Sequence, residues 1–173
     1  MAANGPLIVF LCLTGALLTP GAVARPPYRE FDCPGDWSLF GTRCFRFFEA
    51  EKTWTMAEKS CNNLGGHLAS IHTSWENNFI SGLIDGPAWL GGHDMDQEGV
   101  WMWTDGSPWD YTNWWHGEPN NYGGIEDSLE INAHGHANTF WNDNLSAKKK
   151  GYICAQDALI RDPWDPITIG IPW

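Results

Sequence analysis

The chain has 173 residues with 21 acidic and 10 basic side chains, which gives a formal net charge of −11 at pH 7. A surface of this charge repels polyanions, so nucleic acids and anionic membranes are poor partners. The length is sufficient for one domain with a sizeable core.

The N-terminal segment has the pattern of a secretory signal peptide. An apolar run over residues 7–18 is followed by a helix-breaking Pro-Gly pair and by Ala22-Val23-Ala24, a small-residue cleavage pattern. We therefore expect residues 1–24 to be a signal peptide and the protein to be secreted and extracellular, although this segment lacks the usual Lys or Arg. The apolar run is too short to span a bilayer, and no later stretch is long enough.

The cysteines support the same compartment. Without Cys12, which lies in the expected signal peptide, four cysteines remain, and an even set in a secreted chain predicts two disulfides. Cys33 and Cys44 lie at the two ends of a predicted hairpin and could staple it. A bond between Cys61 and Cys154 would tie the first helix to the last strand of the domain. No thiol would then remain for a covalent dimer.

The rest of the chain divides into a lead at 25–32, a domain at 33–156 and a tail at 157–173 that contains several Pro and Trp residues. A first helix over 53–64 is predicted by an apolar stripe at helical spacing, made of Trp54, Ala57, Cys61 and Leu64. The sequence Thr73-x-x-Glu76 is a capping box that opens a second helix, which Gly86-Pro87 would end. Between Trp89 and Trp141 there is little helical periodicity, and we expect a long loop that a metal orders.

Two polar runs supply oxygen donors of the kind that bind Ca²⁺. Glu118-Pro119-Asn120 continues to Glu126-Asp127, and Trp141-Asn142-Asp143 lies further along the chain. The primary set consists of three carboxylates and two amides, namely Glu118, Asn120, Glu126, Asn142 and Asp143. Ca²⁺ takes six to eight oxygens at about 2.4 Å, and the three carboxylates would repel each other without a cation. Pro119 has a fixed φ and stiffens the loop between the first two donors.

These two runs, the cysteine placement, Trp89-Leu90-Gly91-Gly92 and the closing Tyr152-Ile153-Cys154 resemble the C-type lectin-like domain family over residues 33–154. The chain is similar in particular to small soluble fish lectins of the ladderlectin group, which are themselves similar to type II fish antifreeze proteins. The resemblance implies an α+β fold in which two helices pack on small antiparallel sheets beneath a long calcium-binding loop.

In sugar-binding members of this family the calcium ion coordinates two vicinal hydroxyls, and the side chains that hold the ion also hydrogen-bond those hydroxyls. The resemblance therefore implies that the primary set binds both Ca²⁺ and sugar. The Glu-Pro-Asn triplet implies a preference for mannose-type glycans over galactose. A second, weaker calcium site is implied for a second set, made of Asp94, Glu98, Asn121 and Asp127. The alternative for Asp94 and Glu98 is that they are solvated turn residues.

One departure from the family pattern is the absence of a disulfide. Ser128 and Ser146 stand where the family has cysteines, so we expect their side chains to face each other. The change also creates Asn144-Leu145-Ser146, a possible N-glycosylation site at Asn144.

Other functions have weaker support. An ice-binding protein on the same fold is the main alternative, although Thr residues are few between Trp89 and Asp143. A protein-binding domain is the third choice, because members of that kind tend to lose calcium ligands, whereas this chain keeps all five residues of the primary set. We expect no enzyme, because calcium ligands must stay ionised whereas a general acid needs a raised pKa. His134 and His136 lack a third ligand nearby for zinc.

Because a single sugar site binds weakly, we expect a non-covalent homo-oligomer.

Overall fold

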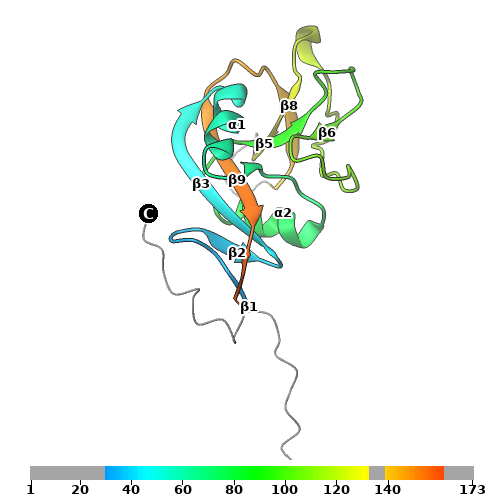
Figure 1. Cartoon of the computed structure of the whole chain (residues 1–173). Coiled ribbons are helices and arrows are strands. Elements are labelled where there is room, and N and C mark those ends of the chain that lie inside the picture. The colour runs from blue at the N-terminus through cyan, green and yellow to red at the C-terminus, as the bar shows by residue number, and fades with distance from the viewer. Residues whose placement is uncertain (1–29, 133–138, 162–173) are drawn as a thin grey trace, which may run out of the picture.

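A computed structural model describes residues 30–132 and 139–161 (Figure 1). The predicted signal peptide, residues 133–138 with their two histidines and the part of the predicted tail beyond Arg161 lie outside the described residues. The elements are, in chain order, β1 (Glu30–Asp32), β2 (Ser38–Phe40), β3 (Arg43–Lys52), α1 (Trp54–Asn62), β4 (His67–Leu68), α2 (Ser74–Ser81), β5 (Ala88–His93), β6 (Met102–Trp103), η1 (Tyr122–Gly124), β7 (Ser128–Ile131), β8 (Trp141–Asn144), β9 (Lys150–Asp157) and β10 (Leu159–Arg161).

One mixed sheet forms the frame of the domain, with strand order β2-β3-β9-β5-β7-β8, while β4 pairs with β9 and β6 with β5. The β5–β9 pair is parallel, and the other pairs of this sheet are antiparallel. With α1 and α2 packed beside this sheet, the predicted α+β class is confirmed (Figure 1).

The first helix follows its predicted stripe for two turns. Trp54, Ala57 and Cys61 are buried, but Leu64 is exposed because α1 ends at Asn62 and the chain turns there. The inclusion of Leu64 in the buried stripe was wrong.

The second helix begins as predicted and ends early. The Glu76 amide donates to the Thr73 hydroxyl over 3.1 Å. The Glu76 carboxylate does not return to Thr73, because it accepts from the His72 amide at 2.8 Å and from Arg43 at 3.0 Å. The helix is capped at Gly82, well before the predicted stop at Gly86-Pro87.

Aromatic packing orders much of the segment that we expected a metal to order. Trp103 lies 4.5 Å from Trp109 and 5.7 Å from Trp141 between ring centroids, and Trp101 lies 4.7 Å from Trp114. Trp141 is fully buried, and its indole N–H donates to the buried amide of Asn77 over 2.7 Å. Edge-to-face and tilted rings of this kind pack favourably. The expectation that only a bound metal could order this stretch was therefore wrong for residues 101–114.

Both predicted disulfides are present. Cys33–Cys44 spans 11 residues and Cys61–Cys154 spans 93, with Cα–Cα distances of 5.6 and 5.3 Å. The second bond joins α1 to β9 within a buried cluster that also contains Trp89.

The two ends of the described chain meet. β1 and β10 form a separate two-stranded antiparallel sheet, and Arg161 forms an ion pair with Asp32. Part of the predicted lead and part of the predicted tail are thus joined beside the domain. Neither described helix has the length and apolar character needed to cross a membrane.

Candidate calcium site

Two parts of the chain bring the primary set together. The segment between β6 and β7 carries Glu118, Asn120 and Glu126, and β8 carries Asn142 and Asp143. β7 follows directly after Glu126-Asp127 and pairs with β8 in antiparallel register. The sheet therefore fixes where the second run lies relative to the end of the first.

Asp143 is the link between the two runs. It is 1% exposed, and its carboxylate accepts from the backbone amides of Asn120 at 3.1 Å and Asn121 at 2.6 Å. The prediction that the two runs meet in space is borne out by these bonds. The Glu118–Pro119 peptide bond within the first run is cis.

A tight turn returns the loop to Glu126. Asn121 has a left-handed backbone with φ of 43°, and its side-chain oxygen accepts from the Glu126 amide at 3.0 Å. The Glu126 carboxylate accepts in turn from the Tyr122 amide at 3.1 Å. Asn tolerates this conformation better than most residues, so Asn121 suits the turn.

Two carboxylates of the primary set have raised pKa values. Burial raises the pKa of Glu118, and its hydrogen bond to Asp143 and the charge of Asp143 raise it further. Burial also raises the pKa of Glu126, against the opposing hydrogen bond from Tyr122. The Oε2 atom of Glu118 is buried and has no hydrogen-bond partner among the described residues.

These features fit a cation. A buried, unpartnered carboxylate oxygen is costly, and a hard divalent ion would satisfy it and remove the repulsion with Asp143. Over residues 30–132 and 139–161, no three His, Cys, Asp or Glu side chains are already arranged to hold a metal ion. Two members of the primary set are Asn side chains, and the Asp143 carboxylate accepts hydrogen bonds from backbone N–H groups of the loop. The three carboxylates of the set therefore lie near one another but do not point at one common position.

The second set is also partly assembled. Asp94 is buried, with one carboxylate oxygen accepting from the Gly99 amide at 2.8 Å and the other unpartnered among the described residues. The Asn121 side chain donates to Glu98, and the Asp94 amide donates to the Asp127 carbonyl at 3.3 Å. Burial raises the pKa of Asp94, and the charges of Asp127 and Asp143 add to this. The alternative that these two are solvated turn residues fits Glu98, which is exposed, but does not fit Asp94, which is buried.

The serine pair lies beside the primary set. The Ser128 and Ser146 hydroxyl oxygens are 2.7 Å apart, and Ser128 is fully buried. They face each other as predicted. Asn144 is buried as well, and its amide nitrogen donates to Glu130 over 2.7 Å. A glycan on that nitrogen would have to be accommodated at this contact with Glu130, and glycosylation of Asn144 stays a prediction.

Glu130 is a neighbour that the sequence reasoning missed. Its carboxylate also accepts from the Asn142 amide nitrogen at 2.8 Å and lies 2.5 Å from the Lys150 ammonium. Its place opposite Asn142 in the β7–β8 register is visible only once the strands are paired. A single charged residue between Leu129 and Ile131 was the available signal.

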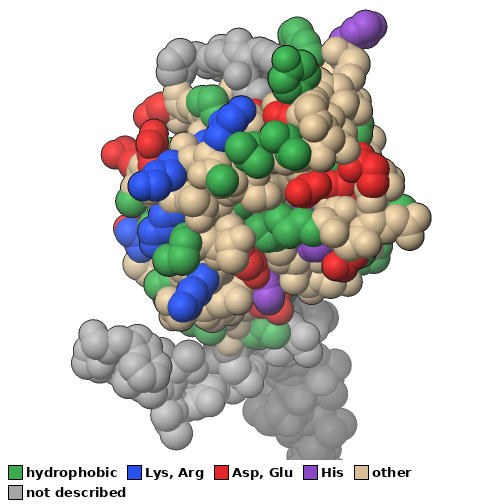
Figure 2. All heavy atoms as spheres, turned by 90° about the horizontal axis from the view of Figure 1, so that it is seen from above, with side chains coloured by type: hydrophobic (Ala, Val, Ile, Leu, Met, Phe, Trp, Pro, Cys, Tyr) green, Lys and Arg blue, Asp and Glu red, His purple; other side chains and the backbone are tan. Residues whose placement is uncertain are grey.

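Exposed apolar side chains lie close to the primary set. Tyr122 is 79% exposed and Ile125 is 53% exposed, and both lie in the turn between Asn121 and Glu126. Trp115 packs edge-to-face on Phe140 with ring centroids 5.1 Å apart, and both remain partly exposed. The face in Figure 2 shows hydrophobic side chains among acidic ones, while Lys and Arg gather toward one side.

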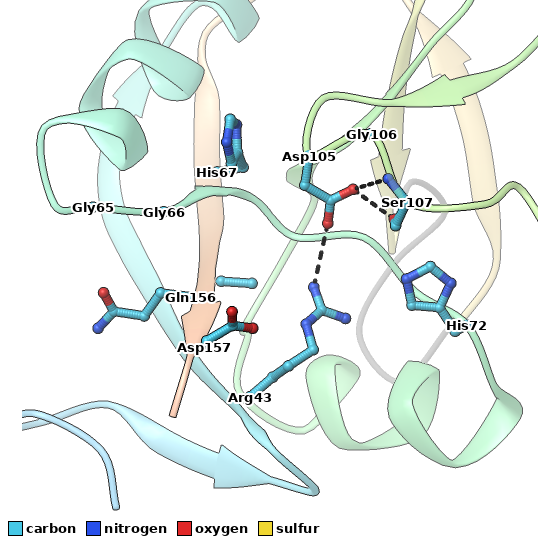
Figure 3. A pocket seen from close by; sticks show the side chains of 11 residues that line it. Arg43, Gly65, Gly66, His67, His72, Asp105, Gly106, Ser107, Gln156 and Asp157 are labelled. Carbon is cyan, nitrogen blue, oxygen red and sulfur yellow. Dashed lines mark hydrogen bonds and ion pairs between the residues drawn. The ribbon is translucent and has the colours of Figure 1, made fainter. Parts of the chain in front are cut away.

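A separate polar pocket of about 450 Å³ contains none of the primary set. Figure 3 shows Arg43, Asp105 and Ser107 pointing toward one another within it. Ser70 lies within 3.2 Å of His72, which lies 2.8 Å from Asp110, an order of contacts seen in nucleophilic triads.

This pocket does not have the properties of an active site. Ser70 is fully buried, and its hydroxyl donates to Asp105 over 2.5 Å and accepts from Arg43 over 2.8 Å. Arg43 is itself paired with Glu76. The network joins β3, α2 and the long loop, because the Arg43 guanidinium lies between the carboxylates of Glu76 and Asp105.

Comparisons with known proteins define the class of this chain. A family model described as the Lectin C-type domain matches residues 50–156. The Galactose-specific lectin nattectin of Thalassophryne nattereri is 37% identical over 163 residues, covering 91% of this chain and 99% of that protein. Ladderlectin of Oncorhynchus mykiss is 43% identical over 117 residues, covering 64% and 60%. A Type-2 ice-structuring protein of Brachyopsis segaliensis is 37% identical over 131 residues, covering 76% of each.

Solved structures show the same fold. A calcium-independent type II antifreeze protein has a TM-score of 0.71 at 36% identity, covering 75% of this chain and 98% of that one. The cow C-type carbohydrate-recognition domain of CD23 has a TM-score of 0.69 at 34% identity, with coverage of 75% and 98%. A Ca²⁺-dependent type II antifreeze protein in its Ca²⁺-free form has a TM-score of 0.67 at 33% identity, with coverage of 72% and 99%.

The fold and the matched domain place this molecule in a non-enzymatic class of domains whose members include lectins and antifreeze proteins. The chain belongs to the C-type lectin domain family. Members of the family generally bind Ca²⁺, and the structures above include both a calcium-dependent and a calcium-independent relative.

Proposed function

We propose that this protein is a secreted, calcium-dependent lectin that binds sugar through the primary set. The observation that carries the proposal is the acidic cluster around Asp143, in which Glu118 keeps a buried oxygen without a partner among the described residues. The two disulfides and the N-terminal pattern support an oxidising, extracellular compartment.

The primary set would hold one Ca²⁺ ion, which when bound supplies coordination sites for two vicinal sugar hydroxyls. The carboxylates of Glu118 and Glu126 can contact the ion with one oxygen and accept a hydroxyl proton with the other. The amides of Asn120 and Asn142 can contact the ion through oxygen and donate through nitrogen. Asp94, Glu98, Asn121 and Asp127 would hold a weaker second ion.

Mannose-type glycans on microbial or cell surfaces are the proposed ligands. The support is the order of acceptor and donor in the Glu-Pro-Asn triplet, with a carboxylate at Glu118 and an amide at Asn120. Tyr122 offers an exposed aromatic face next to this triplet for contact with a sugar ring. The printed name of one relative specifies galactose, so sugar preference has to be measured directly.

A single shallow site binds one sugar at about millimolar affinity, equivalent to about −4 kcal/mol. Useful avidity requires several sites, so we propose a non-covalent homo-oligomer. The support is that all four cysteines from Cys33 onward are consumed within the chain.

Affinity chromatography on immobilised mannan tests the proposal. Retention should require calcium, EDTA should release the protein, and mannose should elute it at lower concentration than galactose. Retention in EDTA would contradict calcium dependence, and easier elution by galactose would contradict the preference.

Ice binding is the second candidate, favoured by the matches to type II ice-structuring and antifreeze proteins. It predicts thermal hysteresis in a freezing assay and no retention on mannan. Because the two candidates differ in both assays, one preparation of the protein decides between them.

A further inference from the structure

Glu130 is a buried carboxylate directly behind the primary set. It is 2% exposed in β7 and stands opposite Asn142 in the β7–β8 register. One of its oxygens accepts from the amide nitrogens of Asn142 at 2.8 Å and Asn144 at 2.7 Å. An ionised carboxylate only accepts hydrogen bonds, so both asparagines must turn their nitrogens toward it.

Lys150 fixes the orientation of Glu130 from the other side. Its ammonium lies 2.5 Å from the second Glu130 oxygen and 5.3 Å from the centroid of the Trp89 ring. The lysine side chain is 14% exposed, so both charges of the pair are largely withdrawn from water. Moving either charge away from the other would leave both uncompensated in a site with little water, which is costly. The ion pair therefore holds the Glu130 carboxylate in one place.

We propose that Glu130 is a positioning residue that holds the Asn142 side chain in the orientation needed for calcium. With one N–H of Asn142 engaged by Glu130, the amide oxygen on the other branch is left for the ion. The second N–H of the same nitrogen is left for a sugar hydroxyl. The role rests on the proposed function, and it explains how one amide can serve both ligands without rotating.

Glu130→Gln is the isosteric test. Lys150 attracts a carbonyl oxygen, so the new side chain turns its oxygen to Lys150 and its NH₂ group to the two asparagines. Asn142 must then flip and present nitrogen, instead of oxygen, to the ion. Loss of a group that orients a metal ligand typically weakens metal affinity about 10–100-fold, and we expect a decrease of this size.

Two further variants separate orientation from general damage. Glu130→Gln combined with Lys150→Met removes the ammonium that captures the glutamine oxygen, so this oxygen can face Asn142 again. We expect the double variant to recover at least part of the calcium affinity. Asn144→Ala removes the other side-chain amide that contacts Glu130 but leaves Asn142 in place. The calcium affinity of this variant should stay within about threefold of that of the unchanged protein, which is much less than the loss expected on removing an orienting group.

Calorimetric titration of the full chain with calcium alone provides the readout, and thermal unfolding in EDTA reports the stability of each variant separately. Weak binding by Glu130→Gln with recovery in the double variant is the expected result. Equal affinity of Glu130→Gln and the unchanged protein would overturn the proposal, as would a double variant that binds no better than the single one. If the unchanged protein binds no calcium, the proposed site itself fails, and the role of Glu130 fails with it.

Discussion

Introducing a disulfide at the serine pair should stabilise the part of the domain that carries the primary set. In the double change Ser128→Cys with Ser146→Cys, the side chains replaced have oxygens 2.7 Å apart, so two sulfurs can bond with little movement of the backbone. The loop between the two positions spans 18 residues. Closing a loop of this length restricts the unfolded chain by roughly 3 kcal/mol in the entropy model.

Thermal unfolding in EDTA measures the effect. For a domain of this size about 3 kcal/mol corresponds to a rise of roughly 10 °C in Tm. Ser128→Ala with Ser146→Ala is the matched control, because it removes the same hydrogen bond and cannot form a bridge. A bridge that fails to form on secretion would refute the predicted geometry. A bridge that forms without raising Tm above the control would refute the expectation that closing this loop restricts the unfolded chain.

Further predictions concern the cation and the core. Calcium affinity should fall from neutral pH toward about pH 4–5, because protons compete with the ion for the carboxylates. Calorimetric titration at several pH values measures this affinity, and a constant value over that range would contradict the prediction. Without calcium the sign reverses for two groups: the raised pKa values of Glu118 and Glu126 contribute stability at low pH that is lost as pH rises through those values, whereas the lowered pKa values of Asp32 and Asp105 act in the opposite direction. In EDTA, neutralisation should therefore change Tm less favourably in the unchanged protein than in a Glu118→Gln, Glu126→Gln control, and an equal change in both would contradict the reasoning. Glu118→Gln with Asn120→Asp keeps the total charge at the ion but exchanges the positions of the hydrogen-bond donor and acceptor. Calcium binding should survive, and galactose should now elute the protein from immobilised mannan at lower concentration than mannose does. An unchanged preference for mannose would show that other residues set specificity. Trp141→Ala should cost about 3–5 kcal/mol in chemical denaturation, and a loss below about 1 kcal/mol would contradict its central place among the tryptophans.

The local features of this chain could be predicted from sequence because each depends on neighbouring residues. The Thr73 cap needs only the amide three positions on, and the two donor runs each consist of adjacent residues. The family resemblance then supplied the pairing of distant parts. It placed Ser128 opposite Ser146 across 18 residues, which no periodicity indicates.

Features that depend on strand register could not be predicted. Glu130 becomes a neighbour of Asn142 only because β7 and β8 pair at that position, and its partner Lys150 comes from a third strand. Lys150 belongs to a basic run that composition alone suggests is solvated. The tryptophan cluster also depends on distant residues, since Trp103 and Trp141 pack together although they lie 38 residues apart in the sequence.

Helix ends also departed from local signals. The pattern favoured Leu64 as a buried position and Gly86-Pro87 as a stop, whereas α1 ends at Asn62 and α2 at Ser81. The antiparallel pairing of β1 with β10 joins segments 129 residues apart, which lie in the predicted lead and tail.

The central claim is that sugar is held through a calcium ion at the cluster around Asp143. Calorimetric titration of the calcium-loaded protein with a methyl mannoside tests it most directly, compared with the same titration in EDTA and with Asp143→Asn in calcium. Asp143→Asn removes one charge from the cluster and one acceptor of the loop amides, while the two disulfides are untouched. We predict binding at about millimolar affinity for the calcium-loaded protein and none in the other two samples. Equal binding of the mannoside in all three would contradict the claim.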